Sequence, residues 1–311
     1  MSSMAIQTEQ LTKIYTEVTR GGLVQKKRTG VRDLNLEVKT GEVFAFLGPN
    51  GAGKSTTIKL LTRLIFPTNG RAFVMGIPTA RRVAMRRVGY LPEQPNIYGY
   101  LTGREFLHYV AKLCGLSNTD ARNQAEILIR QVGLEGRADS HVRSYSRGMT
   151  QRLGLAQALV HDPDLLILDE PLSNLDPIGR KEVRDLILEL KKQGKTIFFS
   201  SHILSDAELV ADRVAILNMG RLIRTGKMDA LDAARTSSVE ITFQTDETAR
   251  ARMDLTHWDA VCQDMNIMIR IEDAGDIPKT LKQIEQWGGK LVSVIPQRQS
   301  LEEYFMAELG R

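Results

Sequence analysis

The sequence predicts an α/β protein with a parallel β-sheet, followed by a smaller α+β domain. Two observations support the first part. Short apolar runs recur at residues 165–168, 196–199 and 214–217, and helical patterns such as residues 178–192 lie between them. Apolar strands that alternate with helices are typical of a parallel sheet covered on both faces. The second part rests on three strands with alternating apolar residues that follow a change in composition near residue 236.

The composition is that of an ordinary globular chain. Its 311 residues are 42% hydrophobic and 25% charged, which is enough apolar material for one large domain and a small one. The formal net charge of +5 and the pI of about 9.2 suit a phosphate-bearing ligand, an acidic ligand or a membrane surface, and require none of them.

The sequence argues against a secreted or membrane-spanning chain. No apolar run approaches the length of about eighteen residues that a membrane helix needs, and the N-terminus lacks the features of a secretory signal. Cys114 and Cys262 are far apart in the sequence, so reduced thiols are expected rather than a disulfide. The five histidines show no metal-ligand spacing. We therefore expect a cytoplasmic soluble chain.

The N-terminal part contains a predicted hairpin. Apolar and polar residues alternate from residue 34 to residue 38, Thr40 and Gly41 indicate a turn, and residues 43–47 run apolar. Residues 34–47 are therefore expected to form a hairpin that leads into a core strand.

Two further segments lie outside the predicted sheet. The stretch between Tyr15 and Val31 contains the basic run Lys26, Lys27 and Arg28 and is expected to be a mobile surface loop, with a contact to lipid headgroups or to a partner's loop as the alternative. The segment from about residue 100 to residue 160 has no strand pattern and indicates a helical insertion.

The predicted C-terminal domain combines strands with helices. Its strands are expected at residues 239–243, 267–271 and 291–295. Before the last of them, an amphipathic helix is expected to have Asp276 as its cap and to end at Gly288 and Gly289. Ser300 and Glu303 have the spacing of a capping box for a terminal helix.

A phosphate-binding motif follows the first core strand. The sequence GPNGAGKST matches G-x-x-x-x-G-K-[ST] between a strand and a predicted helix. Its backbone N–H groups and the start of the helix should face phosphate oxygens. Lys54 should reach the terminal phosphates and Ser55 should hold Mg²⁺; a glycine-rich turn without nucleotide is the alternative. The motif consists of Gly48, Pro49, Asn50, Gly51, Ala52, Gly53, Lys54, Ser55 and Thr56.

Two carboxylates come directly after the apolar run 165–168. Strands of this kind bring their C-terminal residues to the ligand-binding edge of an open sheet. Asp169 is therefore predicted to bind Mg²⁺ directly or through water, and Glu170 to orient and deprotonate the attacking water. A helix cap or a surface pair is the alternative.

A second candidate anion site precedes a helical pattern that begins near residue 147. A serine hydroxyl and free backbone N–H groups at a helix N-terminus attract an anion, and Ser146 and Gly148 lie there. One chain has no second phosphate to fill this site, so it is predicted to serve a neighbouring copy.

From residue 5 to about residue 230, the sequence resembles the ATP-binding subunit of an ABC transporter. The phosphate loop and Asp169–Glu170 occur in the family's order, together with its other motifs. The resemblance implies that Tyr15 stacks on adenine, that Gln94 touches Mg²⁺ and senses the membrane partner, and that His202 contacts the γ-phosphate. It places the signature motif at Ser146, Arg147, Gly148 and Met149, and the D-loop at residues 173–176, with Ser173 and Asp176.

The family resemblance implies a P-loop NTPase core of the ABC ATPase type, with antiparallel β and helical subdomains. The ATPase domain would cover residues 1–236, with a helical subdomain at about 100–160, and a C-terminal α+β accessory domain would cover residues 237–311. Lys54, Glu170 and His202 would be the catalytic residues, and ATP and Mg²⁺ the cofactors.

The resemblance also implies partners and a location. Two copies would close head to tail on two ATP molecules, each bound between one phosphate loop and the other copy's signature. A separate membrane permease would dock near Gln94–Tyr100. The chain would lie at the inner face of the cell membrane and would power export, and no nucleic acid is expected as a partner.

Departures and alternatives remain at the sequence level. Arg147 and Met149 replace the third and fifth residues of the family's commonest signature, and Arg147 is expected to face water. One alternative is a non-transport ABC-type ATPase that acts on ribosomes or DNA, against which stand the single cassette and the lack of a sustained heptad pattern. Another is a module that holds ATP without turnover, which the presence of Glu170 disfavours.

Overall fold

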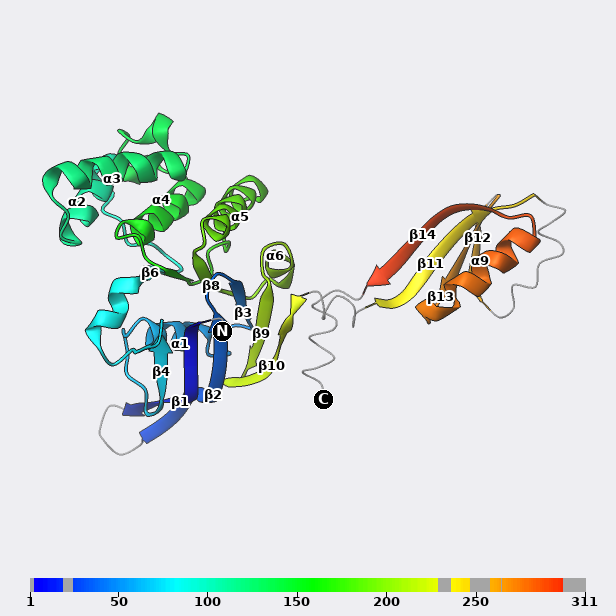
Figure 1. Ribbon diagram of the computed structural model, residues 1–311, viewed down its shortest axis with the longest axis horizontal. Coiled ribbons are helices and arrows are strands. Elements are labelled where there is room, and N and C mark those ends of the chain that lie inside the picture. The colour runs from blue at the N-terminus through cyan, green and yellow to red at the C-terminus, as the bar shows by residue number, and fades with distance from the viewer. Residues whose placement is uncertain (1–2, 19–24, 229–235, 247–257, 264, 299–311) are drawn as a thin grey trace. The chain divides into compact units, whose positions relative to one another are not determined.

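The computed structural model describes residues 3–18, 25–228, 236–246, 258–263 and 265–298. The chain divides into two compact units, residues 1–228 and residues 229–311 (Figure 1). In the described parts of the chain, no helix is both long and apolar enough to cross a membrane.

The first unit begins with an antiparallel sheet of strand order β2-β1-β4-β5. Strands β1 and β2 are long and pair along most of their length, so the predicted surface loop before Val31 is wrong for residues 16–18 and 25–30, which belong to these strands. Residues 19–24 lie outside the described part. The strands are β1 (Met4–Val18), β2 (Gln25–Lys39), β4 (Asn69–Val74) and β5 (Ile77–Pro78).

A second, mainly parallel sheet has the strand order β10-β9-β3-β8-β7-β6. Strand β3 lies between β8 and β9 and is parallel to both, whereas the edge strand β10 is antiparallel to β9. The strands are β3 (Val43–Leu47), β6 (Val88–Leu91), β7 (Leu165–Leu168), β8 (Thr196–Ser201), β9 (Arg213–Asn218) and β10 (Arg221–Lys227).

The hairpin predicted for residues 34–47 does not form. A turn occurs at Thr40 and Gly41, but β2 pairs with β1 while β3 enters the parallel sheet. The burial pattern gives the reason. All five residues of β3 are buried, as expected for a central strand covered on both faces, whereas β2 alternates between buried and exposed residues.

Helices connect the strands, and three of them lie side by side between β6 and β7 (Figure 1). Side chains fix several of their starts: Thr102 and Glu105 form a capping box, and Asp176 accepts a hydrogen bond from the N–H of Gly179. The helices are α1 (Lys54–Leu61), α2 (Gly103–Leu113), α3 (Asn118–Gln131), α4 (Arg147–Leu159), α5 (Pro177–Lys192) and α6 (Leu204–Glu208), with short 3₁₀ turns η1 (Arg82–Arg87), η2 (Glu135–Arg137) and η3 (Val142–Ser144).

One hydrophobic core joins both sheets of the first unit. It combines buried side chains of β1 and β2 with those of β3, β7, β8 and helix α1. The ring of Phe198 stacks on Phe44 with centroids 5.9 Å apart and contacts Phe46 at 5.3 Å. The site described below is therefore supported by one hydrophobic core that both sheets share.

The second unit is an antiparallel sheet of order β12-β13-β11-β14 with one helix. Its core contains Phe243 and Ile284, the latter from the helix. The three predicted strands and the helix are present, and β12 was not predicted. The elements are β11 (Thr236–Gln244), β12 (Asp259–Gln263), β13 (Asn266–Ile271), the turn η4 (Ala274–Asp276), α9 (Ile277–Gln286) and β14 (Lys290–Arg298).

The ends of α9 differ in part from expectation. Asp276 occupies the cap position, but its carboxylate makes no capping hydrogen bond, and its backbone carbonyl accepts from the hydroxyl of Thr280 instead. Gly288, with φ +73°, ends the helix as predicted. The predicted terminal helix at Ser300 and Glu303 lies outside the described residues.

Gly89→Ala is expected to destabilise the first unit by about 2–3 kcal/mol. A Cβ at this position in β6 would lie 2.2 Å from the carbonyl oxygen of Ala158 and 2.7 Å from Leu166 Cδ2, so helix α4 would have to move. Gly136→Ala is the control, because a Cβ there has no neighbour within 4 Å. Urea unfolding followed by circular dichroism measures the change.

Both tryptophans, Trp258 and Trp287, belong to the second unit, so tryptophan fluorescence reports on that unit during the same titration. Equal midpoints for Gly89→Ala and Gly136→Ala by circular dichroism would contradict the packing argument.

Candidate nucleotide-binding site

The candidate site lies at the carboxyl edge of the parallel sheet. Strands β3, β8 and β7 are neighbours there, with Leu47 opposite Ser201 and Phe199 opposite Leu168. The phosphate loop follows β3, and the two carboxylates follow β7. Strand β8 ends with Ser200 and Ser201, and His202 follows it. Three segments that are far apart in sequence are therefore brought together by strand order alone.

The phosphate loop packs closely against its surroundings. A Cβ on Gly48 would lie 2.3 Å from the carbonyl oxygen of Leu217 in β9, and one on Gly53 would lie 2.3 Å from that of Gly30 in β2. Gly53 also has φ +110°, a value that side chains rarely adopt. Only glycine satisfies both the close approach and the positive φ at position 53. Helix α1 starts at the next residue, Lys54.

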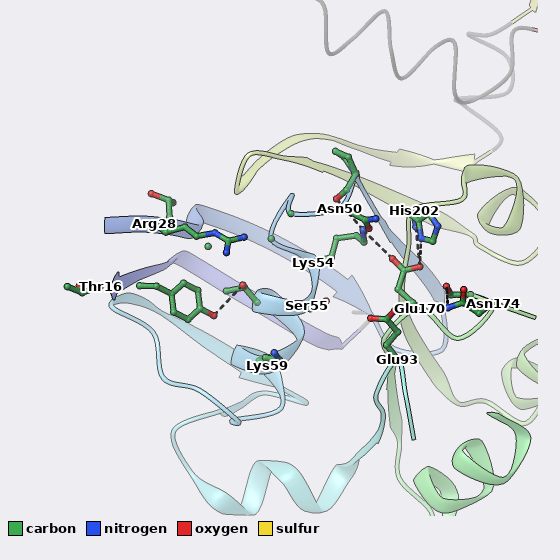
Figure 2. Close-up of a pocket in the computed structure, with 18 residues that line it drawn as sticks. Thr16, Arg28, Asn50, Lys54, Ser55, Lys59, Glu93, Glu170, Asn174 and His202 are labelled. Carbon is green, nitrogen blue, oxygen red and sulfur yellow. Dashed lines mark hydrogen bonds and ion pairs between the residues drawn. The ribbon is translucent and has the colours of Figure 1, made fainter. Parts of the chain in front are cut away.

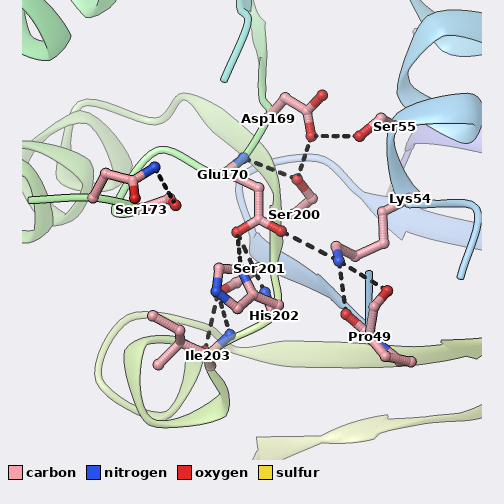
Figure 3. Close-up of polar contacts among 12 residues, drawn as sticks. Pro49, Lys54, Ser55, Asp169, Glu170, Ser173, Ser200, Ser201, His202 and Ile203 are labelled. Carbon is pink, nitrogen blue, oxygen red and sulfur yellow. Dashed lines mark hydrogen bonds and ion pairs between the residues drawn. The ribbon is translucent and has the colours of Figure 1, made fainter. Parts of the chain in front are cut away.

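Lys54 is the central cation of the site. It is only 5% exposed, and its Nζ donates to the carbonyl oxygens of Gly48 at 2.7 Å and Pro49 at 3.3 Å. The same Nζ lies 3.2 Å from Glu170 Oε1 (Figure 3). Lys54 is thus held at the mouth of the loop whose N–H groups can bind phosphate.

Glu170 is held from both sides. Its backbone has φ +49°, an uncommon value for a residue with a side chain. Its N–H donates to Ser200 Oγ at 2.9 Å, and its Oε2 lies 2.8 Å from His202 Nδ1 and accepts from the His202 N–H at 3.3 Å. A backbone strain at this position is compensated by fixed contacts, so the carboxylate has one defined direction.

Asp169 lies beside the start of helix α1. Its Oδ1 accepts hydrogen bonds from Ser200 Oγ at 2.7 Å and from Ser55 Oγ at 3.3 Å (Figure 3). Burial raises the pKa of Asp169 above its ordinary value, and the hydrogen bonds from Ser200 and Ser55 act in the opposite direction. A hydroxyl and a carboxylate so placed form a set of hard oxygen ligands that fits Mg²⁺.

A cavity of about 700 Å³ runs along this edge (Figure 2). Glu170, Ser173 and His202 line one part of it, and Tyr15 and Arg28 of the antiparallel sheet line another. The predicted loop residues Pro49, Asn50, Gly51, Gly53, Lys54, Ser55 and Thr56 line it as well.

The Tyr15 ring fits closely against the phosphate loop's helix. Its hydroxyl lies 3.4 Å from Thr56 Oγ1, and its Cε2 would lie 2.7 Å from a Cβ on Gly30. The Lys13 ammonium lies 5.5 Å from the ring centroid. Tyr15 therefore offers an aromatic surface on the part of the cavity wall formed by the antiparallel sheet.

The remaining predicted residues lie elsewhere. Gln94 lines a neighbouring cavity together with Arg147, and Asp176 caps helix α5. Ser146 caps helix α4, with its Oγ accepting from the N–H of Met149 at 3.2 Å. Gly148 and Arg147 line a third hollow together with Asp176, and the signature residues do not line the Tyr15–Glu170 cavity.

Sequence reasoning missed several residues of the site. Ser200 donates to the Asp169 carboxylate and accepts from the backbone N–H of Glu170, but a serine in an apolar strand carries no visible signal of its own. Arg28 is predicted to lie in a surface loop, and residues 25–30 contain no apolar alternation that would indicate a strand there. Glu93, Thr16 and Lys59 also line the cavity.

Comparisons with known proteins identify relatives over the whole chain. A family model described as ABC transporter matches residues 31–173. An uncharacterized ABC transporter ATP-binding protein of Nostoc sp. is 39% identical over 317 residues, covering 98% of this chain and 90% of the relative. A bacitracin transport ATP-binding protein of Bacillus licheniformis is 37% identical over 315 residues, covering 99% of this chain and 98% of the relative.

Solved structures agree with these relatives. An ATP-binding subunit of an ABC transporter superposes with a TM-score of 0.62 at 32% identity, covering 74% of this chain and 92% of that one. A dimeric ATP-binding cassette in a post-hydrolysis state, bound to ADP and Pi, superposes with a TM-score of 0.64 at 25% identity, covering 72% of this chain and 98% of that one. The chain belongs to the family of ABC transporter ATP-binding proteins and is an ATPase of that family.

Proposed function

We propose that this ATPase powers export through a separate membrane permease by closing, as a head-to-tail dimer, on two ATP molecules. The contacts from Lys54 through Glu170 to His202 are the observation that supports the site assignment most directly. They occur in a cavity that Tyr15 also lines. Adenine stacks on Tyr15 in this proposal, and the phosphates extend toward Lys54.

The chain's own residues have distinct tasks at the phosphates. Lys54 and the loop N–H groups neutralise the charge that develops on the terminal phosphate. Glu170 accepts the proton of the attacking water, and His202 holds the Glu170 carboxylate and contacts the γ-phosphate. Ser55, Gln94 and Asp169 would hold Mg²⁺, which would supply further charge neutralisation.

The signature turn completes the site of a second copy. Ser146, Arg147, Gly148 and Met149 lie at the N-terminus of helix α4, where free N–H groups and the helix dipole favour an anion. Because these residues do not line their own chain's nucleotide cavity, they are available to another chain. Ser173 lines the nucleotide cavity, Asp176 lines the hollow that contains the signature residues, and both contribute the D-loop in this proposal.

The membrane partner docks near Gln94–Tyr100. Tyr98 and Tyr100 are exposed and their rings contact each other, with centroids 5.6 Å apart. Docking at this surface would hold the chain at the inner face of the cell membrane. Similarity over 99% of this chain to a bacitracin transport ATP-binding protein supports a transport role for a chain that includes the second unit. Residues 1–236 are proposed as the ATPase domain and residues 237–311 as an accessory domain, whereas the compact units themselves divide between residues 228 and 229.

Glu170→Gln is expected to lower ATP hydrolysis by about 100-fold or more while ATP binding persists, because the amide cannot accept the proton from water. Phosphate release and nucleotide titration measure the two effects. Glu135→Gln, an exposed change on η2, is the matched control.

The tagged Glu170→Gln chain, purified from its native cells in mild detergent with ATP and Mg²⁺, is expected to bring down a polytopic membrane protein in stoichiometric amount. Recovery of ribosomes or DNA-processing proteins in its place would contradict the transport role and support the soluble alternative.

Two individually inactive chains are expected to regain ATPase activity when mixed. Lys54→Ala removes the phosphate-loop cation and Ser146→Asp places a repelling charge in the signature turn. A mixed head-to-tail dimer still contains one intact phosphate loop opposite one intact signature. Steady-state hydrolysis of the mixture is the measurement. No recovery, with both chains folded and dimeric, would exclude a composite site.

Ser200→Ala is expected to lower kcat by about tenfold with little change in KM, because one hydroxyl positions both Asp169 and Glu170. Ser140→Ala, outside the site, serves as the control. An unchanged kcat, or a loss seen only in KM, would show that the hydroxyl does not position the carboxylates for the reaction.

A further inference from the structure

The basic side chain of Arg28 lines the nucleotide cavity. Residues 25–30 belong to strand β2, which carries Arg28 to the cavity wall that also contains Tyr15. The strand pairing puts Arg28 directly opposite Tyr15, and residues paired in this way project from the same face of the sheet. Arg28 and the aromatic ring are therefore neighbours on one surface.

The next residue on that face of β2 leaves room for the pair. Gly30 is two positions after Arg28, and a Cβ there would lie 2.7 Å from Tyr15 Cε2 and 2.9 Å from Thr56 Cγ2. The bare glycine lets the ring lie against helix α1. Tyr15, Arg28 and Gly30 all line the cavity.

The guanidinium extends toward the phosphate loop. Figure 2 shows the Arg28 side chain running from β2 toward the side of the cavity where Asn50 and Lys54 lie, and Thr16 marks the opposite side. The side chain is exposed, and among the described residues no carboxylate forms an ion pair with it. Its five N–H donors are thus available to a ligand.

We propose that Arg28 binds the nucleoside-monophosphate part of the nucleotide, through its ribose and α-phosphate oxygens. This inference rests on the proposed placement of adenine on Tyr15 and of the terminal phosphates at Lys54. The Arg28 side chain begins beside Tyr15 and extends toward Lys54. The ribose and the α-phosphate, which would lie between adenine and the terminal phosphates, are therefore within its reach. A planar guanidinium suits phosphate oxygens better than an ammonium does.

The position also separates Arg28 from the chemistry. Glu170, Asp169 and His202 follow strands of the parallel sheet, whereas Arg28 belongs to the antiparallel sheet. Arg28 is therefore proposed to act on nucleotide affinity, so its loss is expected to raise Kd and KM.

The test compares nucleotides that differ in phosphate number. Arg28→Ala is expected to weaken ATP, ADP and AMP by a similar factor of about tenfold, because all three contain the α-phosphate. Displacement of a fluorescent ATP analogue from the full chain measures each Kd. Arg28→Gln, which keeps a shorter, neutral side chain with N–H donors, is the second variant, and it is expected to show a smaller loss of the same pattern.

Lys27→Ala is the matched control. Lys27 is the neighbouring exposed cation, it pairs with Thr16 rather than with Tyr15, and it does not line the cavity. Its Kd values are expected to stay within about twofold of the parent chain, because a surface charge change of this kind has small effects. Lys54→Ala serves as the benchmark for the proposed function and should weaken ATP far more than AMP.

The possible results test the Arg28 contact and the proposed nucleotide site separately. A loss for Arg28→Ala that grows from AMP to ADP to ATP would show action through overall charge and would overturn the α-phosphate contact. An unchanged Kd for Arg28→Ala, with ATP binding weakened by Lys54→Ala, would overturn the Arg28 contact and leave the proposed site in place. If Lys54→Ala also leaves ATP binding unchanged, the proposed site itself is wrong.

Discussion

The rest of the site depends on the close backbone approach around the phosphate loop. Gly48 lies against the carbonyl of Leu217 in the parallel sheet, and Gly53 lies against the carbonyl of Gly30 in the antiparallel sheet. The N–H of Gly220, in the turn after β9, also donates to the Ala52 carbonyl at 2.8 Å. The phosphate loop therefore lies between the two sheets and contacts both. These contacts fix the positions of Lys54, Ser55 and helix α1.

Ser200 has a similar organising effect on the opposite side of the site. A single buried hydroxyl donates to Asp169 and accepts from the N–H of Glu170, so two adjacent carboxylates are held in different directions. One carboxylate then faces Ser55 and the other faces Lys54 and His202. Two chemically similar side chains acquire separate environments, which is how one site can combine metal binding with proton transfer.

The sequence was informative where local pattern and chemistry coincide. The parallel sheet, the phosphate loop and the strand-end carboxylates all follow from apolar runs and motif spacing. The hairpin expected at residues 34–47 failed because a turn signal says nothing about which sheet the next strand joins. The long β1–β2 pairing was missed because the residues at its outer end are rich in charge, and charged segments are typical of surface loops. Ser200 and Arg28 act through partners distant in sequence, and only the tertiary structure brings those partners together.

The division of the cavity between two sheets has a thermodynamic consequence. A nucleotide that touches both Tyr15 and Lys54 bridges the antiparallel sheet and the helix that follows the phosphate loop. By mass action, a ligand at 100 times its dissociation constant adds about 2.7 kcal/mol to the free energy of unfolding. Because the contacts fall on both sheets, this linkage would reach the strand hairpin and the carboxylate edge together. Cellular nucleotide would then act as a structural component of the cassette as well as its fuel.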